Sequence, residues 1–430
     1  MSKYFNYDII NQTGELLMSN GRIIFHIDMN CFYASCELAL LPELKNSPVA
    51  VAPYASRRKS IILSANYEAR KYGVKAAMSV SEAQRICPNI VILESHMELY
   101  SEFSQKFFDY FFSITPLVEP ASIDEGYLDV TEVCKNINAI DLANKIQQDL
   151  MNLYSLPSSI GIAPNKVLAK IASDMKKPLG IVILRKREVP NILWPMPVDT
   201  LPGVGKKTLP VLKMLNINTV GDLANYKDFK VLEEVLGPTN SRSLIALAHG
   251  EGSNVIDVNR FSENSSISNS QTFDNDEYDV NNMKSVLKIL SNSVSYRLEK
   301  AKNKAYTFTV QIKYSNYHSV SRCRTLNNPI NNAKEMYLLL EDIFDDLYDV
   351  DTPIRLVGVS ASKLITYNDE IYQISIFDNL DESEKKQSIN NLLSNLQNTF
   401  GKTVIKQGID EKNSEYFKYD KSYKIKNRNG

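Results

Sequence analysis

Two adjacent carboxylates, Asp124 and Glu125, stand between two short apolar runs of the sequence. Leu117-Val118 and Tyr127–Val130 read as β-strands on either side of them. Because neighbouring side chains of a strand point to opposite faces, both carboxylates converge only at a turn or at a strand end. Adjacent acids repel each other and are costly to bury unless a divalent cation lies between them. We therefore expect an acidic strand end here, with the solvated loop pair as the alternative.

A third carboxylate, Asp28, ends the apolar run that begins at Ile23, which reads as a buried strand. Hard oxygen ligands of this kind suit Mg²⁺ or Mn²⁺. Two such ions about 3.5–4 Å apart activate a 3′-hydroxyl and stabilise a leaving pyrophosphate. We predict that Asp28, Asp124 and Glu125 together form a two-metal catalytic centre.

Strands and helices alternate along the chain as far as Leu184, which predicts one α/β domain. Further strands are expected at Val49–Ala52 and Ser60–Ser64. A helix is expected at Tyr67–Tyr72, closed by Gly73 in the usual position after a helix.

The second half of the chain changes character. Residues 194–249 predict short helices joined by glycine-containing turns, and the polar, aperiodic stretch 251–265 contains the expected linker, 255–265. Beyond it the pattern is βαββαβ, typical of a small split α/β domain. The expected elements are a strand at 266–273, a helix at 283–302, two strands within 306–326, an acidic helix at 333–348 and a strand at 354–363.

Length and composition restrict the class of protein. At 430 residues the chain is too long for one compact core, so about two to four domains are expected. It has no apolar run long enough to cross a membrane and no signal peptide at its start, so we expect a cytoplasmic protein. The five cysteines are scattered without a C-x-x-C pair, which predicts reduced structural thiols and no zinc site.

Charge is distributed unevenly although the net charge is −1. Between Ile160 and Lys213 there are ten basic residues against three acids, whereas Glu335–Asp351 contains seven acids and no base. Such asymmetry indicates a surface for a polyanion and other faces that avoid it, with solvated charge runs as the alternative.

Four segments carry a family resemblance. His26–Glu37 and Ser122–Asp129 resemble the two catalytic motifs of Y-family translesion DNA polymerases, the ImpB/MucB/SamB type. Ser64–Val74 looks like the finger motif of that family, and Ser159–Pro178 like its palm lysine motif. The four occur in the family order with similar spacing, and the resemblance extends over about residues 23–364.

The resemblance implies that Asp28, Asp124 and Glu125 ligate two Mg²⁺ ions, or Mn²⁺, with the backbone carbonyl of Met29 as a further ligand. Asn30 is a departure, because some members have an Asp there. Asn looks normal in the UmuC-like branch, and the position is not a direct ligand.

The resemblance also implies a nucleotide site. Tyr33 would be the steric gate, whose ring lies under the incoming sugar and excludes a 2′-hydroxyl, and Phe32 would lie beside it. The alternative is that both are ordinary core aromatics. Tyr67, Arg70 and Lys177 would hold the triphosphate, which agrees with the preference of phosphate oxygens for guanidinium and ammonium groups.

Residues 201–208 are not a phosphate-binding P-loop, because the first glycine of that motif would fall at Thr200. They read as the hairpin of a helix-hairpin-helix, where glycines let backbone N–H groups approach a DNA phosphate, with a plain helix-joining turn as the alternative. Adjacent lysines add salt-sensitive attraction. The predicted DNA contacts here are Gly203, Gly205, Lys206 and Lys207.

In the last domain, strands that carry Lys313, Arg322 and Arg324 are expected to lie along the DNA duplex backbone, while the acidic helix faces solvent. Phosphate contacts fix position without reading sequence, as a polymerase requires.

A short apolar motif follows the last strand: Gln373, Ile374, Ser375, Ile376 and Phe377. Apolar residues in a hydrophilic tail suggest a peptide anchor for a partner's pocket. The motif resembles the pentapeptide that binds the bacterial sliding clamp, which implies a bacterial or phage origin, whereas a satellite strand is the alternative.

The predicted fold is thus a multidomain α/β right-hand polymerase. Palm (22–31 and 97–184), fingers (32–96), helical thumb (185–254), linker (255–265), little finger (266–366) and a C-terminal tail (367–430) follow in order. The resemblance implies a monomeric DNA-directed DNA polymerase that extends primer-template DNA with dNTPs, in lesion bypass, DNA repair and the SOS response, with or without an accessory subunit. The alternatives are a palm-fold nucleotide cyclase and a weakly catalytic DNA- and clamp-binding regulator.

Overall fold

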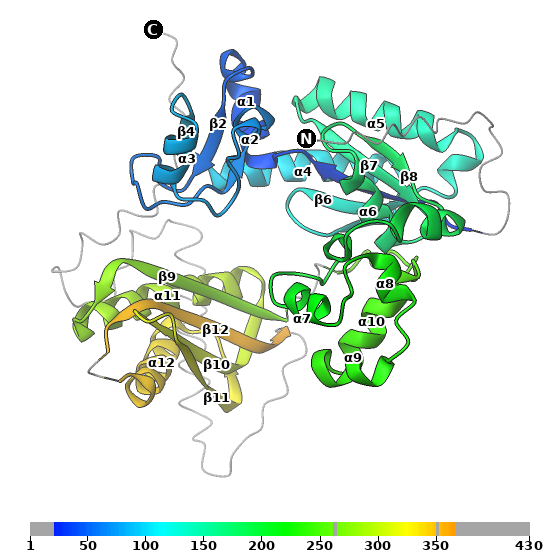
Figure 1. Cartoon of the computed structure of the whole chain (residues 1–430). Coiled ribbons are helices and arrows are strands. Elements are labelled where there is room, and N and C mark those ends of the chain that lie inside the picture. The colour runs from blue at the N-terminus through cyan, green and yellow to red at the C-terminus, as the bar shows by residue number, and fades with distance from the viewer. Residues whose placement is uncertain (1–20, 261–264, 350–351, 367–430) are drawn as a thin grey trace, which may run out of the picture. The chain divides into compact units, whose positions relative to one another are not determined.

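A computed structural model describes residues 21–260, 265–349 and 352–366. The chain divides into two compact units between residues 263 and 264, and each is described by itself (Figure 1). No described helix is both long and apolar enough to span a bilayer.

A five-stranded sheet organises the first unit, in the order β5-β6-β1-β7-β8. Its central strand β1 is antiparallel to both neighbours, and only β7 and β8 are parallel to each other. The apolar run at the start of the chain therefore becomes the middle of the sheet, as its burial on both faces requires. The strands are β1 (Ile24–Met29), β5 (Val118–Pro120), β6 (Glu125–Asp129), β7 (Ser158–Ala163) and β8 (Ile181–Ile183).

Helices cover both faces of this sheet. On one face Phe25 and Ile27 pack with the phenylalanines of α4 and the apolar side of α5. On the other face Ile24 and Tyr127 pack with α6 and with the helices that follow it. The helices here are α1 (Phe32–Leu40), α4 (Met97–Ile114), α5 (Ala139–Tyr154) and α6 (Lys166–Met175), with the short turn η2 (Val133–Lys135).

A small three-stranded sheet, in the order β3-β2-β4, lies between α1 and α4 in sequence and has its own core. The prediction of a strand at Ser60–Ser64 is wrong for most of that range. Pairing with β2 begins only at Ser64, and Ile61 makes an isolated bridge to Ser79. The elements are η1 (Pro42–Leu44), β2 (Val49–Ala52), β3 (Ser64–Ala65), α2 (Tyr67–Lys71), α3 (Val80–Ile86) and β4 (Val91–Glu94). Gly73 follows α2 with φ of +90°, as expected of a residue that ends a helix.

Short helices complete the first unit and share a core with α6. They are η3 (Lys186–Glu188), η4 (Val189–Leu193), η5 (Val198–Thr200), α7 (Thr208–Met214), α8 (Val220–Ala224), α9 (Phe229–Leu236) and α10 (Pro238–Ala248).

The first part of the expected linker, 255–265, packs against the first unit. Ile256 is buried, and the backbone N–H of Asp257 donates to the carboxylate of Glu119 over 2.8 Å. Arg260 donates to the other oxygen of Glu119 over 2.7 Å. Polar composition alone does not indicate these contacts, because Glu119 lies far away in sequence.

The second unit is the βαββαβ domain that the sequence predicted. Its antiparallel sheet has the order β11-β10-β12-β9, and both helices pack on one face. The elements are β9 (Ser266–Glu277), α11 (Val280–Lys300), β10 (Asn303–Tyr314), β11 (Ser319–Ile330), α12 (Ala333–Leu347) and β12 (Ile354–Thr366).

The other face of this sheet is open and rich in hydroxyl groups. The cross-strand rows place Ser360 beside Thr309 and Ser268, and Gln311 beside Ser321. These residues line a shallow cavity on the sheet. The open face thus carries short polar side chains and no carboxylate along these rows.

Candidate nucleotidyl-transfer site

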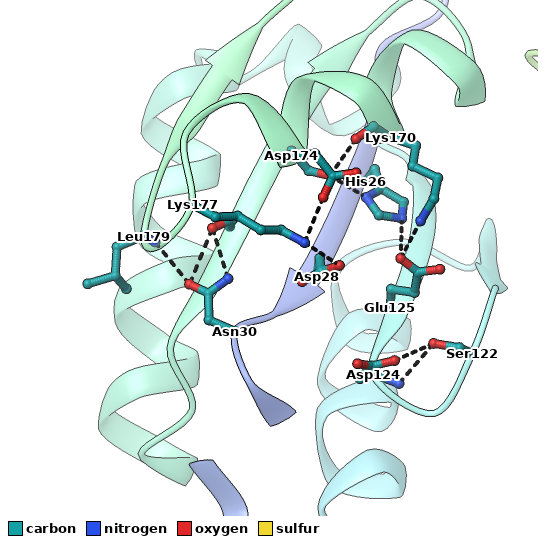
Figure 2. A network of polar contacts seen from close by, with 12 residues as sticks. His26, Asp28, Asn30, Ser122, Asp124, Glu125, Lys170, Asp174, Lys177 and Leu179 are labelled. Carbon is teal, nitrogen blue, oxygen red and sulfur yellow. Dashed lines mark hydrogen bonds and ion pairs between the residues drawn. The ribbon is translucent and has the colours of Figure 1, made fainter. Parts of the chain in front are cut away.

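Asp28 and Glu125 are cross-strand partners at the end of the five-stranded sheet. Both side chains lie on the face that α6 covers, since His26 and Tyr127, two residues from each, contact α6 or its core. Asp124 lies one residue outside β6, in the turn before it. The acidic pair therefore stands at the start of β6, beside the end of β1 that carries Asp28, but the Asp124 side chain turns toward Ser122 and that of Glu125 toward Lys170 and His26 (Figure 2).

Glu125 accepts a hydrogen bond from Lys170, and His26 lies beside the same carboxylate oxygen. Lys170 Nζ lies 2.5 Å and His26 Nε2 3.3 Å from Oε2. Burial alone would raise the pKa of Glu125, but His26 and Lys170 lower it to about 2. The Ser173 hydroxyl donates to the Lys170 carbonyl and so accepts from His26 Nδ1 over 2.7 Å. This bond fixes the imidazole ring with Nε2 toward the carboxylate.

Asp28 is paired with Lys177, whose Nζ lies 2.8 Å from Oδ2. The same ammonium lies 2.7 Å from Asp174 Oδ1. Burial raises the pKa of Asp28 above its usual value although Lys177 opposes the shift. Asp28 is 15% exposed, so this carboxylate needs a positive charge beside it.

Asp124 is oriented by its own turn. The Ser122 hydroxyl donates to Oδ1 over 2.5 Å, and the backbone N–H of Met29 donates to the Asp124 carbonyl over 2.9 Å. The second bond ties the turn to the end of β1. Within the described residues, no three His, Cys, Asp or Glu side chains gather closely enough to hold an ion.

A cavity of about 310 Å³ opens beside these carboxylates. It brings together all five residues predicted to bind the nucleotide: Phe32, Tyr33, Tyr67, Arg70 and Lys177. They come from α1, α2 and the loop after α6, so segments more than a hundred residues apart form one wall. Phe32 is almost fully buried, as its alternative reading as a core residue predicted.

Tyr67 and Arg70 form a pair at the start of α2. The guanidinium carbon of Arg70 lies 4.8 Å from the Tyr67 ring centroid, and Arg70 Nε donates to the carbonyl of Ala65 over 2.9 Å. In the part of the chain described, the buried Tyr67 hydroxyl has no hydrogen-bond partner. A buried hydroxyl without a partner is costly, which suits a site whose polar ligand completes it.

Asn30 is buried and holds the loop that carries Lys177. Its Oδ1 accepts from the backbone N–H of Leu179 over 2.9 Å, and its Nδ2 donates to the Ser159 hydroxyl over 3.0 Å. An amide at this position therefore connects β1 to the loop after α6 (Figure 2).

The residues predicted to contact DNA lie in two places. The turn before α7 contains Gly203 with φ of +92° and the exposed Lys206 and Lys207, and a side chain at Gly205 would meet no atom within 4 Å. Lys313 lies on the open face of the second unit's sheet, opposite Ser319.

Arg322 and Arg324 do not share that face with Lys313. They lie at two-residue spacing between Val320 and Leu326, and therefore on the same face of β11 as these two residues, which pack on the helix-covered core. Both arginines pair with acids of α12. Asp346 forms ion pairs with both arginines. The acidic helix therefore neutralises these two arginines on its own face. The motif at 373–377 lies outside the described residues.

Sequence reasoning missed several residues of the site. Lys170 and Asp174 belong to the charged stretch between Ile160 and Lys213, and His26 to the first strand, and these patterns assign them no role in the site. Their signal was the helical spacing of Lys166, Lys170, Asp174 and Lys177, which puts one row of α6 and its following loop against the carboxylates.

Comparisons with known proteins agree with this geometry. Residues 27–174 match the model of the impB/mucB/samB family, residues 264–376 that of the impB/mucB/samB family C-terminal domain, and residues 186–217 the IMS family HHH motif.

The chain is 40% identical to DNA polymerase IV of Bacillus velezensis over 93% of its length and 95% of that protein. It is 41% identical to DNA polymerase IV 1 of Bacillus subtilis, over 92% and 94% of the two chains. A solved Y-family DNA polymerase chimera superposes with a TM-score of 0.72 at 28% identity, covering 80% of this chain and 99% of the chimera. The chain therefore belongs to the impB/mucB/samB family, the Y family of DNA polymerases.

Proposed function

We infer that the chain is a translesion DNA polymerase that adds deoxynucleotides to a primer 3′-hydroxyl under the direction of a template. The observation that carries this inference is one cavity in which the acidic end of the sheet meets Tyr33, Tyr67, Arg70 and Lys177. Paired carboxylates supply metal ligands, and the basic wall supplies partners for a triphosphate.

The donor set suits two divalent cations. Asp28 is buried enough to need a positive charge, and Lys177 supplies one in this structure. Asp28, Asp124 and Glu125, with the carbonyl of Met29, would hold the ions, Mg²⁺ or Mn²⁺. When bound, the ions activate the attacking hydroxyl and stabilise the leaving pyrophosphate.

The chain's own residues bind and orient the nucleotide. Arg70 and the Tyr67 hydroxyl donate to phosphate oxygens, and Lys177 moves its ammonium from Asp28 to the triphosphate. Tyr33, which lies on the cavity wall, would be the steric gate for the sugar. Phe32 supports it from the core.

DNA would contact two surfaces. The glycine turn at 201–208 would hold a phosphate through backbone N–H groups and attract it through Lys206 and Lys207. In the second unit, the hydroxyl-rich open face and Lys313 would lie along the duplex, since short neutral donors contact phosphates without reading bases. The arginines at 322 and 324 would contribute only at the strand edge.

These assignments correspond to palm (22–31 and 97–184), fingers (32–96), thumb (185–254) and little finger (266–366), with the protein acting as a monomer in the bacterial cytoplasm. Residues 373–377 would bind the sliding clamp. Replacing Ile376 and Phe377 by alanine should remove stimulation of primer extension by the clamp and leave clamp-free extension unchanged; equal stimulation of both proteins would refute clamp binding by this motif.

Primer extension decides the main proposal. Wild type should extend a primer opposite undamaged and lesion-bearing templates, whereas Asp124→Asn should lose extension by at least about 10³-fold while it retains DNA binding. Equal or absent extension by both proteins would indicate a regulator. Cyclic nucleotide formed from ATP or GTP without DNA would indicate a cyclase instead.

A further inference from the structure

The proposed gate residue Tyr33 lies flat on a second tyrosine. The ring of Tyr33 stacks on that of Tyr100 with centroids 4.4 Å apart and ring planes 15° from parallel. Tyr33 is partly exposed on the cavity wall, whereas Tyr100 is fully buried. The stacked pair thus has one ring toward the nucleotide site and one in the core.

Tyr100 is fixed at its far end by a buried carboxylate. Its hydroxyl donates to Glu37 Oε1 over 2.6 Å, and Glu37 is 5% exposed. Burial and this hydrogen bond raise the pKa of Tyr100 far above its usual value, so the hydroxyl remains a donor. His96 Nδ1 lies 2.9 Å from the same carboxylate oxygen.

The contacting residues have the same spacing on the two helices that carry them. Tyr33 and Glu37 are four residues apart on α1, and His96 and Tyr100 are four apart at the start of α4. Residues at this spacing lie on one face of a helix, so the stack and the hydrogen bond join the same two faces. A shift of α4 relative to α1 would disturb both contacts at once.

Further aromatic rings pack around the Tyr100 ring. Phe32 meets Tyr100 edge-on with centroids 6.5 Å apart, and Phe107 meets Phe32 at 86° with centroids 5.9 Å apart. Phe32 and Phe107 are buried. Close packing of this kind leaves the Tyr100 ring no room to turn or retreat.

We propose that Tyr100, anchored by Glu37, is a positioning residue for sugar selection, because it stops the Tyr33 ring from yielding to a 2′-hydroxyl. This proposal rests on the proposed gate role of Tyr33. Selection by exclusion works only when the excluding group is stiff, since a ring that retreats by about 1 Å relieves the clash. Tyr33 lines the cavity, but Tyr100 and Glu37 do not, so both would act through Tyr33.

The test measures kcat/KM for dCTP and for rCTP opposite a template dG, for wild type, Tyr33→Ala, Tyr100→Leu, Tyr100→Phe and Glu37→Gln. Tyr33→Ala should abolish most of the discrimination. Tyr100→Leu should reduce discrimination by about tenfold or more, mainly by raising kcat/KM for rCTP, because the gate loses about 1–2 kcal/mol of support. Tyr100→Phe and Glu37→Gln should fall between, because the ring remains but its anchor is weakened.

Tyr110→Phe is the matched control. Tyr110 is also on α4 and donates to Asp149 over 2.6 Å, but it does not contact Tyr33 in any stacked pair of the described residues. Loss of that bond should leave discrimination unchanged. If Tyr100→Leu fails to fold, Tyr100→Phe decides the question, because it preserves the volume of the core.

The outcomes separate the two proposals. Lost discrimination in Tyr33→Ala together with wild-type discrimination in both Tyr100 variants overturns the positioning role and leaves the gate. Wild-type discrimination in Tyr33→Ala overturns the gate, and the positioning role with it. Equal losses in Tyr100→Phe and Tyr110→Phe mean a general loss of rigidity and also overturn the proposal.

Discussion

The ammonium of Lys177 lies 2.8 Å from the carboxylate of Asp28, so one residue of the proposed triphosphate wall neutralises one residue of the proposed metal site. Asp174 holds the same ammonium from its other side at 2.7 Å. Lysine and a divalent cation would therefore compete for Asp28.

Lys177→Met should raise the affinity for Mn²⁺ about tenfold without nucleotide, because it removes a positive charge beside the ligands. The same change should raise the KM for dNTP, since the triphosphate loses a partner. Electron paramagnetic resonance of Mn²⁺ and single-nucleotide kinetics measure the two effects. Lys176→Met removes the same charge from an exposed neighbour and should change neither; equal Mn²⁺ affinities of the two variants would contradict competition.

Asn30→Ala should raise the KM for dNTP about five- to tenfold with little change in kcat, because the Leu179 N–H loses its acceptor and the loop carrying Lys177 loosens. Asn30→Asp should restore the wild-type KM, since a carboxylate accepts from both Leu179 and Ser159. Steady-state incorporation of one nucleotide is the measurement. An unchanged KM in Asn30→Ala would mean that the amide is dispensable for placing Lys177.

Gly161→Ala should destabilise the first unit by roughly 3 kcal/mol or more, because the added Cβ would lie 1.9 Å from the Ala169 carbonyl oxygen and 2.4 Å from the Ser173 nitrogen. The clash would push α6 away from β7. Gly205→Ala is the control, since no atom lies within 4 Å of its added Cβ. Urea unfolding of both variants tests the contrast, and similar midpoints would argue against close packing of α6 on β7.

Glu119→Gln should destabilise the protein by about 3 kcal/mol at pH 7, because the buried carboxylate holds Lys166, Arg260 and the Asp257 N–H. Burial opposes ionisation, but these three partners lower the pKa of Glu119 below 4.5. The carboxylate is then fully stabilising above about pH 4.5, and this contribution is lost as the pH falls through the folded-state pKa.

The difference in unfolding free energy between wild type and Glu119→Gln should therefore shrink as the pH falls below about 4.5. Urea unfolding at several pH values measures it. Glu102→Gln, which breaks an exposed pair with Lys106, should differ little from wild type at any pH. A gap for Glu119→Gln that stays constant with pH would show that its charge is not the stabilising feature.

The sequence predicted the architecture well where periodicity decides it. The apolar run at β1, the acidic pair at a strand end and the βαββαβ order are all confirmed. The two-residue spacing of Val320, Arg322, Arg324 and Leu326 also indicates the correct face for the two arginines. A prediction from their positive charge alone ignores this spacing.

What the sequence could not provide is register and helix pairing. The facing of Asp28 and Glu125 depends on which residues of β1 and β6 pair. The stack of Tyr33 on Tyr100 and the anchoring of Arg260 by Glu119 join segments that are 67 and 141 residues apart. No local pattern specifies contacts at such separations.

Lys170 and His26 contact a single oxygen of Glu125, and this has a consequence for turnover. Lys170 donates to Oε2 and His26 Nε2 lies 3.3 Å from the same oxygen, so the carboxylate keeps one orientation, and Oε1 is left to a further ligand. In an enzyme without bound DNA, acids that lacked a fixed partner would relax into new hydrogen bonds. A ligand that is oriented in advance has little reorganisation energy to overcome at each new encounter, which favours rapid re-entry into synthesis.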